Sequence, residues 1–335
     1  MHINIYFSIF AEGKCGKIVY YKQMKTVSVV MCTYNGAQYL REQLDSILQQ
    51  TYPIQELIVQ DDCSTDNTVA IVREYMTQCP CIKLYINEHN LGYNKNFKDI
   101  LMKATGDFIA ISDQDDVWFP EKIEMQVNAI GQHDICFTTN FIGKDMENCF
   151  LNSPQYSLEG LLFNAFAGHT MLLQRNFVQK KENWIDFISY DWSLAISAQL
   201  NGGIVLVDKP LNWHRSHDDS AWSLENSRIY PKRSYPKYKP YLYGITNYYR
   251  LHRKKKWGML YSYILKHANP IEHQPAYNMC KCMLSYNPFA LLRLCCYCLK
   301  YRETIYPSRN VKGAMGVIRS FFYPFIFSFQ NVRYE

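Results

Sequence analysis

The chain has 335 residues, of which 48% are hydrophobic and 20% charged, as is ordinary for a globular protein with one sizeable core. It has no stretch of 18 or more uncharged apolar residues, which excludes a predicted membrane-spanning helix. Residues 226–335 hold 19 Lys and Arg against three Glu, whereas residues 1–225 hold 17 basic and 27 acidic residues. We therefore expect an acidic globular part and a basic, Tyr-rich region suited to phosphate, nucleic acid or an anionic membrane.

The N-terminal stretch "INIYFSIF" lacks the basic region that precedes the apolar core of a signal peptide. Periodic structure begins at "MKTVSVVM", so we expect residues 1–25 to be an extension, with Met24 as a candidate start. The 12 cysteines include one CxxC spacing, Cys295 with Cys298, and no second such pair that would complete a zinc site. Five cysteines stand singly, and Cys32 and Cys136 among them are in apolar segments, where a buried thiol is usual. We expect core packing or chance to explain the close pairs, including Cys79 with Cys81, and a reducing compartment.

Strand and helix patterns alternate from residue 26 to residue 140. Continuous β-branched runs such as "VSVVMC" indicate strands buried on both faces. Amphipathic segments with capping residues or an early proline indicate helices between them. The predicted strands are 27–32, 56–62, 82–87, 107–113 and 134–140.

This alternation predicts right-handed crossovers and a mainly parallel sheet with helices on both faces. In such sheets the ligand lies outside the carboxyl ends of the strands. Asp and Asn side chains gather at these predicted ends, in residues 33–35, 61–62, 90–96 and 113–116. We therefore expect one polar crevice there.

The pattern after residue 150 is less regular. Residues 190–203 predict a helix with Asp191 in its first turn and glycines at its end. "LLFNAFAGHTMLLQ" indicates a buried helix or strand, and helical segments are predicted around 256–268 and 277–300. We expect a domain over 26–225 and a mainly helical region over 226–335.

The stretch "ISDQDDVW" places three aspartates within four positions directly after a predicted strand. Crowded carboxylates repel one another unless a cation lies between them. Asp113 and Asp115 have alternate spacing and so can both reach one ion, and Mg²⁺ or Mn²⁺ prefers such oxygen ligands. Asp116 either joins them or caps the next helix. No glycine-rich phosphate loop is present, so a nucleotide diphosphate would be held through the metal.

Five motifs in order make the resemblance to a known family specific. "VSVVMCTYNGAQYL" with "IVQDDCSTDNT", then "NLGYNKNF", "GDFIAISDQDDVW", "DWSLAI" and "HRSH" resemble the family 2 inverting glycosyltransferases of GT-A fold. The "DQDDVW" form is similar to bacterial rhamnosyltransferase-like members. The resemblance covers about residues 26–220 and implies a Rossmann-like α/β fold with a mixed, mainly parallel sheet.

The resemblance also implies roles for individual residues. Asp62 would accept a hydrogen bond from the nucleotide base. Asp115 would bind the metal directly, and Asp113 would lie near both the ribose of the nucleotide and the metal. His217 is a further candidate metal ligand. The other residues expected to line the nucleotide pocket are Thr33, Tyr34, Asn35, Asn90, Gly92 and Asn96.

Asp191 is the candidate catalytic base, because an inverting transfer needs a carboxylate to take the acceptor proton. Alternatively, Asp191 has only a structural role, as an acidic residue that the helix dipole favours in the first turn of a helix. His214 and Arg215 suit a diphosphate. Trp192 and His169 are candidate donor or acceptor contacts, and a core position is the alternative for each.

The sequence thus predicts a metal-dependent inverting glycosyltransferase that uses a nucleoside-diphosphate sugar, rhamnose or a hexose, and a saccharide or lipid-linked acceptor. We expect it to build cell-surface polysaccharide in the cytoplasm, peripherally on the inner face of the membrane, with residues 228–266 near anionic lipid. Nucleic acid is not expected as a partner. The alternatives are a noncatalytic sugar-nucleotide or polysaccharide binding module and a nucleotidyltransferase.

Overall fold

The computed structural model describes residues 7–9, 20–22, 24–164, 167–217, 238–306 and 311–330. A mixed nine-stranded sheet forms the centre of the molecule, with strand order β5-β4-β3-β6-β10-β8-β11-β7 and with β9 paired to β8. The four pairs β3/β4, β4/β5, β3/β6 and β8/β11 are parallel. The strands are β3 Val27–Thr33, β4 Glu56–Asp61, β5 Ile82–Ile86, β6 Phe108–Ser112, β7 Val117–Trp118, β8 Ile135–Gly143, β9 Cys149–Asn152, β10 Met171–Gln174 and β11 Ile204–Arg215.

The expected α/β fold is confirmed, with one difference at the middle of the sheet. β8 does not pair with β6, because the later strand β10 lies between them and is antiparallel to both. This insertion depends on contacts between residues far apart in the chain, which the local pattern of residues does not encode.

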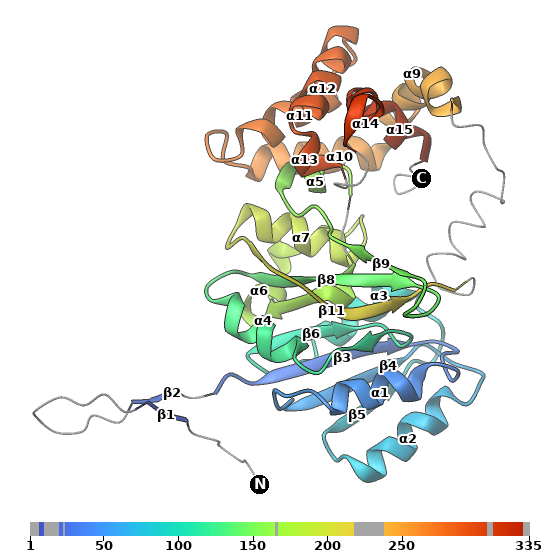
Figure 1. Cartoon of the computed structure of the whole chain (residues 1–335), viewed down its shortest axis with the longest axis vertical. Helices are drawn as coiled ribbons and strands as arrows, with labels where there is room; N and C mark the ends of the chain where they lie inside the picture. The colour runs from blue at the N-terminus through green and yellow to red at the C-terminus, as the bar shows by residue number, and fades with distance from the viewer. Residues whose placement is uncertain are drawn as a thin grey trace, which may run out of the picture.

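Helices cover both faces of the sheet, so its central strands are buried on both sides (Figure 1). Val29 and Met31 of β3 belong to the core formed with α1, α2 and α4, whereas Val30 belongs to the core formed with α3 and α7. These elements are α1 Leu40–Leu48, α2 Thr68–Gln78, α3 Tyr93–Leu101, α4 Lys122–Ile130, α5 Leu158–Leu161, η1 Gly168–Thr170, α6 Arg175–Val178, η2 Lys181–Asn183 and α7 Tyr190–Leu200.

The C-terminal region is helical, as expected, and stacks beyond α5 and α7 (Figure 1). The Tyr261 hydroxyl donates to the Leu162 carbonyl at 2.9 Å, which ties α10 to the segment after α5. The predicted segment 277–300 is two helices rather than one, because Asn287 caps a new helix that begins at Pro288. The helices are α9 Lys239–His252, α10 Lys255–His267, α11 Gln274–Leu284, α12 Pro288–Lys300, α13 Arg302–Ile305, α14 Gly313–Phe321 and α15 Tyr323–Gln330.

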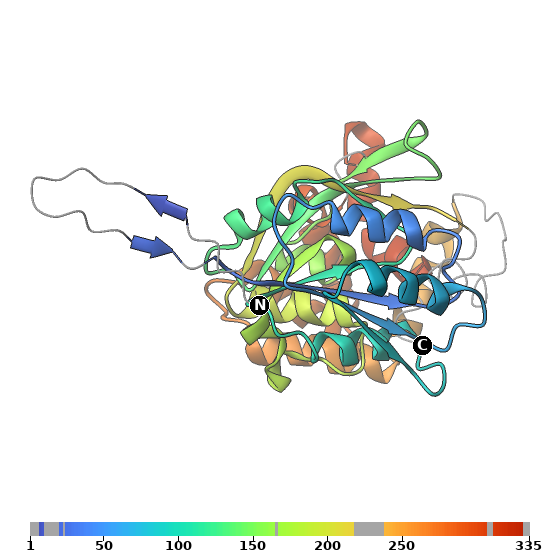
Figure 2. The same ribbon diagram turned by 90° about the horizontal axis from the view of Figure 1, so that it is seen from below.

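Within the described residues, no helix combines the length and apolar character that crossing a membrane requires. Two short strands precede the sheet where none was predicted, β1 Phe7–Ile9 and β2 Tyr20–Lys22. They pair antiparallel and project away from the rest of the molecule (Figure 2).

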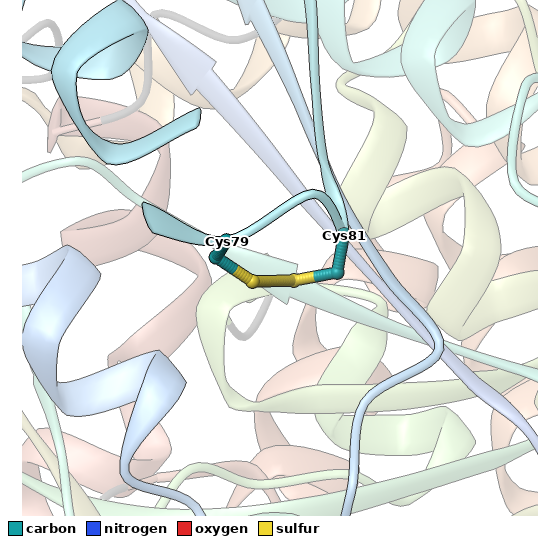
Figure 3. The surroundings of a disulfide bond; sticks show 2 residues. All are labelled: Cys79 and Cys81. Carbon is teal, nitrogen blue, oxygen red and sulfur yellow. A yellow bond between two sulfur atoms is a disulfide. The ribbon is translucent and has the colours of Figure 1, made fainter. Parts of the chain in front are cut away.

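One cysteine pair differs from the expectation. Cys79 and Cys81 form a disulfide with a Cα–Cα distance of 5.3 Å (Figure 3). The bond links the end of α2 to the start of β5 and therefore lies at the amino edge of the sheet, opposite the carboxyl ends of the parallel strands.

Candidate nucleotide and metal site

The carboxyl ends of β3, β4 and β6 meet at one edge of the sheet, as the sequence predicts. Their parallel register aligns Thr33 with Asp61, and the Asp62 amide donates to the Thr33 carbonyl at 2.8 Å. The loops that follow these three strands therefore start side by side and form the walls of the candidate site.

Asp62 organises the loop that follows β5. Its carboxylate is buried and accepts hydrogen bonds from the Asn87 side chain at 2.8 Å and from the amides of Leu91 and Gly92 at 2.8 and 2.9 Å. The Asn90 side chain donates to the Asp62 carbonyl at 3.1 Å. Gly92 has φ +78°, a conformation in which a side chain would be strained. The predicted nucleotide-pocket residues Asp62, Asn90 and Gly92 thus form one connected wall.

Two predicted pocket residues support this wall from behind and do not line it. Thr33 is buried and its hydroxyl donates to Asp61 at 2.9 Å. Asn96 is buried beneath the loop, where it donates to the Gln60 carbonyl and accepts from Asn87. Both side chains are therefore turned into the protein, and their expected contact with the nucleotide is corrected to a supporting role.

The loop after β3 presents Tyr34 at the surface, with 49% of the residue exposed. Gln114, which the sequence reading missed, accepts from the Tyr34 amide at 2.9 Å and donates to its carbonyl at 3.0 Å. Asn35 adopts a left-handed conformation with φ +47°, and its side chain accepts from the Thr65 amide at 2.8 Å. Gln114 thereby joins the loop at Tyr34 to residues 113–116, which we call the aspartate loop.

Two side chains of the aspartate loop belong to a group of two carboxylates and two imidazoles. Asp113, Asp116, His169 and His214 each direct one ligand atom to a common place, and these atoms all lie within 4.8 Å of one another. Asp116 is fully buried and contacts Nδ1 of His214 at 2.7 Å and Nδ1 of His169 at 2.9 Å. The two imidazole rings stack with centroids 4.7 Å apart.

This group differs from the predicted metal set of Asp113, Asp115 and His217. Asp115 instead lies beside it and pairs with Nε2 of His217 at 2.7 Å. Asp116 is not the cap of α4, because its carboxylate is bonded to the two histidines. The cause is the strand pairing, since β11 runs antiparallel to β7 and brings residues 212–217 across from the aspartates.

The charges in the group are strongly coupled. Burial favours the protonated acid, but His169 and His214 outweigh burial and hold the pKa of Asp116 well below its usual range. Burial, together with Asp116 and Asp115, raises the pKa of Asp113 to about 7 against the opposing effect of His169. Burial opposes protonation of His214, but Asp116 raises the pKa of His214 to about 9. Carboxylates held this close are stabilised by a shared cation.

The donor set fits a divalent metal ion. Two carboxylates and two imidazoles are ligand types accepted by Mn²⁺ and other first-row ions, and Mg²⁺ favours the carboxylates. Asn212, also missed from the sequence, donates to Asp116 at 3.3 Å. The sequence did contain an indication of this role for Asn212. It stands two residues before His214, so the two side chains lie on one face of β11.

Arg215 lies beside Asp115. Its guanidinium donates to the Asp115 carbonyl at 3.2 Å and to Glu42 at 2.6 Å, and stacks over the rings of Trp213 and Tyr39 at 4.3 and 4.8 Å. These contacts fix a delocalised cation next to the aspartate loop, where it suits an oxyanion.

Asp191 stands in the first turn of α7, partly exposed, and accepts a hydrogen bond from the Trp192 amide at 2.7 Å. Its neighbour Tyr190 was not predicted as a site residue. Burial raises the pKa of Tyr190 far above its usual range, and the carboxylates of Asp113 and Asp191 raise it further, so its phenol lies near both acids. A side chain at Gly168 would overlap the Tyr190 hydroxyl.

Trp192 is a core residue and not a sugar contact. Its ring is buried and its indole nitrogen donates to the Leu161 carbonyl at 2.7 Å. The side chain points into the core shared by α5 and α7, which leaves it no surface toward the crevice. His169, in contrast, is buried within the group that it forms with Asp113, Asp116 and His214.

Comparison with known proteins agrees with this geometry. The model of the family described as "Glycosyl transferase family 2" matches residues 28–183. The chain is 39% identical over 161 residues to the UDP-Glc:alpha-D-GlcNAc-diphosphoundecaprenol beta-1,3-glucosyltransferase WfgD of Escherichia coli, covering 42% of this chain and 63% of WfgD. It is 28% identical over 210 residues to the dTDP-rhamnosyl transferase RfbG of Shigella flexneri, covering 57% of this chain and 72% of RfbG. It spans 60% of the length of the first curated relatives that it matches.

Solved structures share the fold at low sequence identity. The TarS structure from S. aureus in complex with UDP-GlcNAc superposes with a TM-score of 0.57 at 17% identity, covering 91% of this chain and 89% of TarS. The mannosyltransferase PcManGT of Pyrobaculum calidifontis, in complex with GDP-Man and Mn²⁺, gives 0.53 at 17% identity, covering 91% of this chain and 86% of PcManGT. The family model shows that residues 28–183 form a glycosyltransferase family 2 domain, and the solved structures agree in fold.

Proposed function

We propose that this protein is a metal-dependent, inverting glycosyltransferase that moves a sugar from a nucleoside-diphosphate donor to a hydroxyl of a saccharide, in the assembly of cell-surface polysaccharide. The observation that carries the proposal is the group of Asp113, Asp116, His169 and His214 at the carboxyl edge of the sheet. A partly exposed carboxylate, Asp191, lies near the same place, as its effect on Tyr190 indicates.

The nucleotide would lie between the exposed ring of Tyr34 and the wall built on Asp62. Asn35, Asn90 and Gly92 complete this part of the crevice in the proposal. The polar groups of the wall are already hydrogen-bonded to one another, so the pocket is formed before the ligand arrives and little ordering cost remains.

Asp113, Asp116, His169 and His214 would hold a divalent cation, with Asp115 and His217 beside them. Mn²⁺ or Mg²⁺ held by these residues would supply positive charge to offset the charge that develops on the departing diphosphate. Arg215 is placed by Glu42 and two aromatic rings to contact a diphosphate oxygen.

Asp191 would act as the general base. The acceptor oxygen forms a bond to the anomeric carbon, the bond from that carbon to the diphosphate oxygen breaks, and the acceptor proton passes to the Asp191 carboxylate. Attack from the face opposite the leaving group inverts the configuration.

The donor sugar is rhamnose or a hexose in this proposal, since the relatives include both a dTDP-rhamnosyl and a UDP-glucosyl transferase. A lipid-linked glycan as acceptor is supported by WfgD, whose name gives a diphosphoundecaprenol acceptor. Such an acceptor would place the enzyme in the cytoplasm at the inner face of the membrane.

Calorimetric titration of UDP, dTDP and GDP tests the proposal, with Mn²⁺ and with EDTA. We expect one nucleotide to bind in the presence of Mn²⁺, and the affinity to fall at least tenfold in EDTA and in Asp116→Asn. Asp208→Asn removes an exposed carboxylate on the same strand as His214 and is the matched control. If no nucleotide binds to the folded protein, or if Asp116→Asn binds like Asp208→Asn, the metal-dependent transferase is refuted.

Transfer assays separate the enzyme from a noncatalytic binding module. Asp191→Asn is expected to retain nucleotide binding and to lose donor turnover, since only the proton acceptor is removed. Retained turnover in Asp191→Asn would exclude Asp191 as the base. Nucleotide binding by the wild type without turnover of any sugar donor would favour the binding module.

A further inference from the structure

Helix α14 has an inverted distribution of side chains. Its small residues Gly316 and Ser320 face the protein, where the Ser320 hydroxyl donates to the Gly316 carbonyl at 2.7 Å. Its large apolar residues Met315, Val317 and Ile318 face outward and are exposed, Met315 to 57%. A helix at the surface of a soluble protein normally turns its large apolar residues toward the core and its polar residues toward water. The outward face of α14 therefore needs an apolar partner.

Helix α9 carries a second apolar stripe beside the one that it buries. Gly244, Tyr248 and Leu251 pack into the core, and Gly244 lies against α15. Leu242 and Ile245 lie on a different face and are 66% and 55% exposed. Tyr238, 61% exposed, continues this stripe, because positions 238, 242 and 245 recur at helical spacing.

Helices α9 and α14 meet at one ring contact and through α15, which packs on both. Tyr241 of α9 packs edge-to-face on Phe322 at the end of α14, with ring centroids 5.6 Å apart. Helix α15 lies next to α14, and α9 lies on the other side of α15 (Figure 1). We call the six exposed residues Tyr238, Leu242, Ile245, Met315, Val317 and Ile318 the α9–α14 surface.

The charges around this surface are almost all positive. Lys239, Arg250 and Arg253 are on α9 or at its end, and Lys312 and Arg319 are at the two ends of α14. Within residues 238–306 and 311–330 there are 13 Lys and Arg and two acids, Glu272 and Glu303. Exposed apolar stripes bordered by basic residues are typical of helices that lie in the interface of an anionic bilayer.

We propose that the α9–α14 surface docks this protein on an anionic phospholipid bilayer, with α9 and α14 lying in the plane of the lipid headgroups. A second copy of the chain is a poorer occupant, because a self-complementary contact would bring two strongly basic regions together. The apolar side chains would enter the headgroup–acyl boundary while the flanking Lys and Arg contact lipid phosphates. This deepens the proposed function, since it names the surface that would bring the site to a lipid-linked acceptor.

Vesicle flotation of the full chain tests the proposal without nucleotide or metal, so its result is independent of the transferase chemistry. One vesicle set is neutral phosphatidylcholine and the other carries about 30% phosphatidylglycerol. The test variant combines Leu242→Ser, Ile245→Ser, Met315→Ser and Ile318→Ser. The control variant combines Met146→Ser, Phe150→Ser, Leu151→Ser and Ile271→Ser, which are exposed apolar residues elsewhere in the molecule. Circular dichroism verifies that both variants are folded.

We expect the wild type and the control variant to float with the anionic vesicles, to float much less with the neutral ones, and to dissociate as salt rises. The partition of the test variant into anionic vesicles should fall at least tenfold. The proposal is overturned if the wild type binds neither vesicle, or if the test variant binds like the control. It is also overturned if sedimentation shows a wild-type dimer that the test variant loses while vesicle binding is unchanged.

Discussion

Substitution of Lys122 by Met is expected to stabilise the protein, and to do so more at pH 6 than at pH 9. Lys122 is in the first turn of α4 and fully buried, and its ammonium has no hydrogen-bond partner among the described residues. Burial lowers the pKa of Lys122 to about 7, although Cys136 and Asp116 act in the opposite direction. Met fills a similar volume without a charge.

The pKa gives the magnitude. An unfolded lysine has a pKa of about 10.4, so burying the charged form costs up to about 4–5 kcal/mol at ~1.4 kcal/mol for each pKa unit. The ammonium lies 5.0 Å from the Trp118 ring, a cation–π contact of about 1–2 kcal/mol that Met loses. The net gain at pH 6 is therefore about 2–4 kcal/mol.

The pH dependence has a definite sign. Below pH 7 both states hold the proton and the full cost is present. Between pH 7 and about 10.4 the unfolded state binds more protons than the folded state, so the stability of the wild type rises with pH. The advantage of Lys122→Met should consequently shrink by about 2–3 kcal/mol between pH 6 and pH 9.

Urea unfolding at the two pH values measures this difference. Lys144→Met, which removes an exposed lysine, is the control and should change stability by less than about 0.5 kcal/mol. A destabilised Lys122→Met protein at pH 6, or an equal gain at both pH values, would refute the assignment of an unpaired buried charge.

Two further changes test the support of the sheet and of the site. Glu56 is buried and bonded to Ser28 and Lys83 at 2.6 Å each, and these and other hydrogen bonds outweigh burial and lower the pKa of Glu56 to about 2. The ionised carboxylate stabilises the fold by up to about 3 kcal/mol above pH ~4.5, and this stabilisation is lost as the pH falls toward 2. The unfolding free energy of Glu56→Gln should therefore fall less with pH between 4.5 and 2 than that of the wild type. An equal fall in both proteins would contradict this role of Glu56. Gly168→Ala should displace the Tyr190 side chain and lower both stability and donor turnover. The double variant with Tyr190→Phe should recover part of the stability, because the closest overlap is with the hydroxyl. Thermal unfolding of the single and double variants decides this, because equal losses in both would mean that the overlap is not with the hydroxyl.

The sequence predicted the parts of this protein that depend on local pattern. The strands up to residue 113 and the collection of polar side chains at their ends follow from hydrophobic runs and turn residues. Asp113 and Asp62 were found because each directly follows a buried strand. The helical nature of the C-terminal region followed from its periodicity.

The remaining features depend on contacts between distant segments. Asp116 joins His169 and His214 only because β10 enters the sheet and β11 pairs with β7, and neither pairing has a local signal. Trp192 faces the core because of the rotation of α7 against α5, which the helical pattern did not fix. The exposure of the apolar residues of α14 could not be predicted either. The sequence pattern of a helix shows that one face is apolar, but it does not show whether protein or lipid covers that face.

The antiparallel insertion of β10 has a consequence for how the protein folds. An antiparallel strand starts at the edge where its parallel neighbours end, so His169 reaches the aspartates as Met171–Gln174 fill the gap between β6 and β8. The pairing of β10 with β6 and β8 thus fills the centre of the sheet and brings His169 to the aspartates in one step of folding. It joins residues that are more than 50 positions apart in the chain, and such non-local pairing forms slowly. A nascent chain that ends before η1 would have a split sheet and would lack His169 and His214, two of the four residues proposed to hold a metal. The proposed metal site would therefore form only after most of the fold has been synthesised.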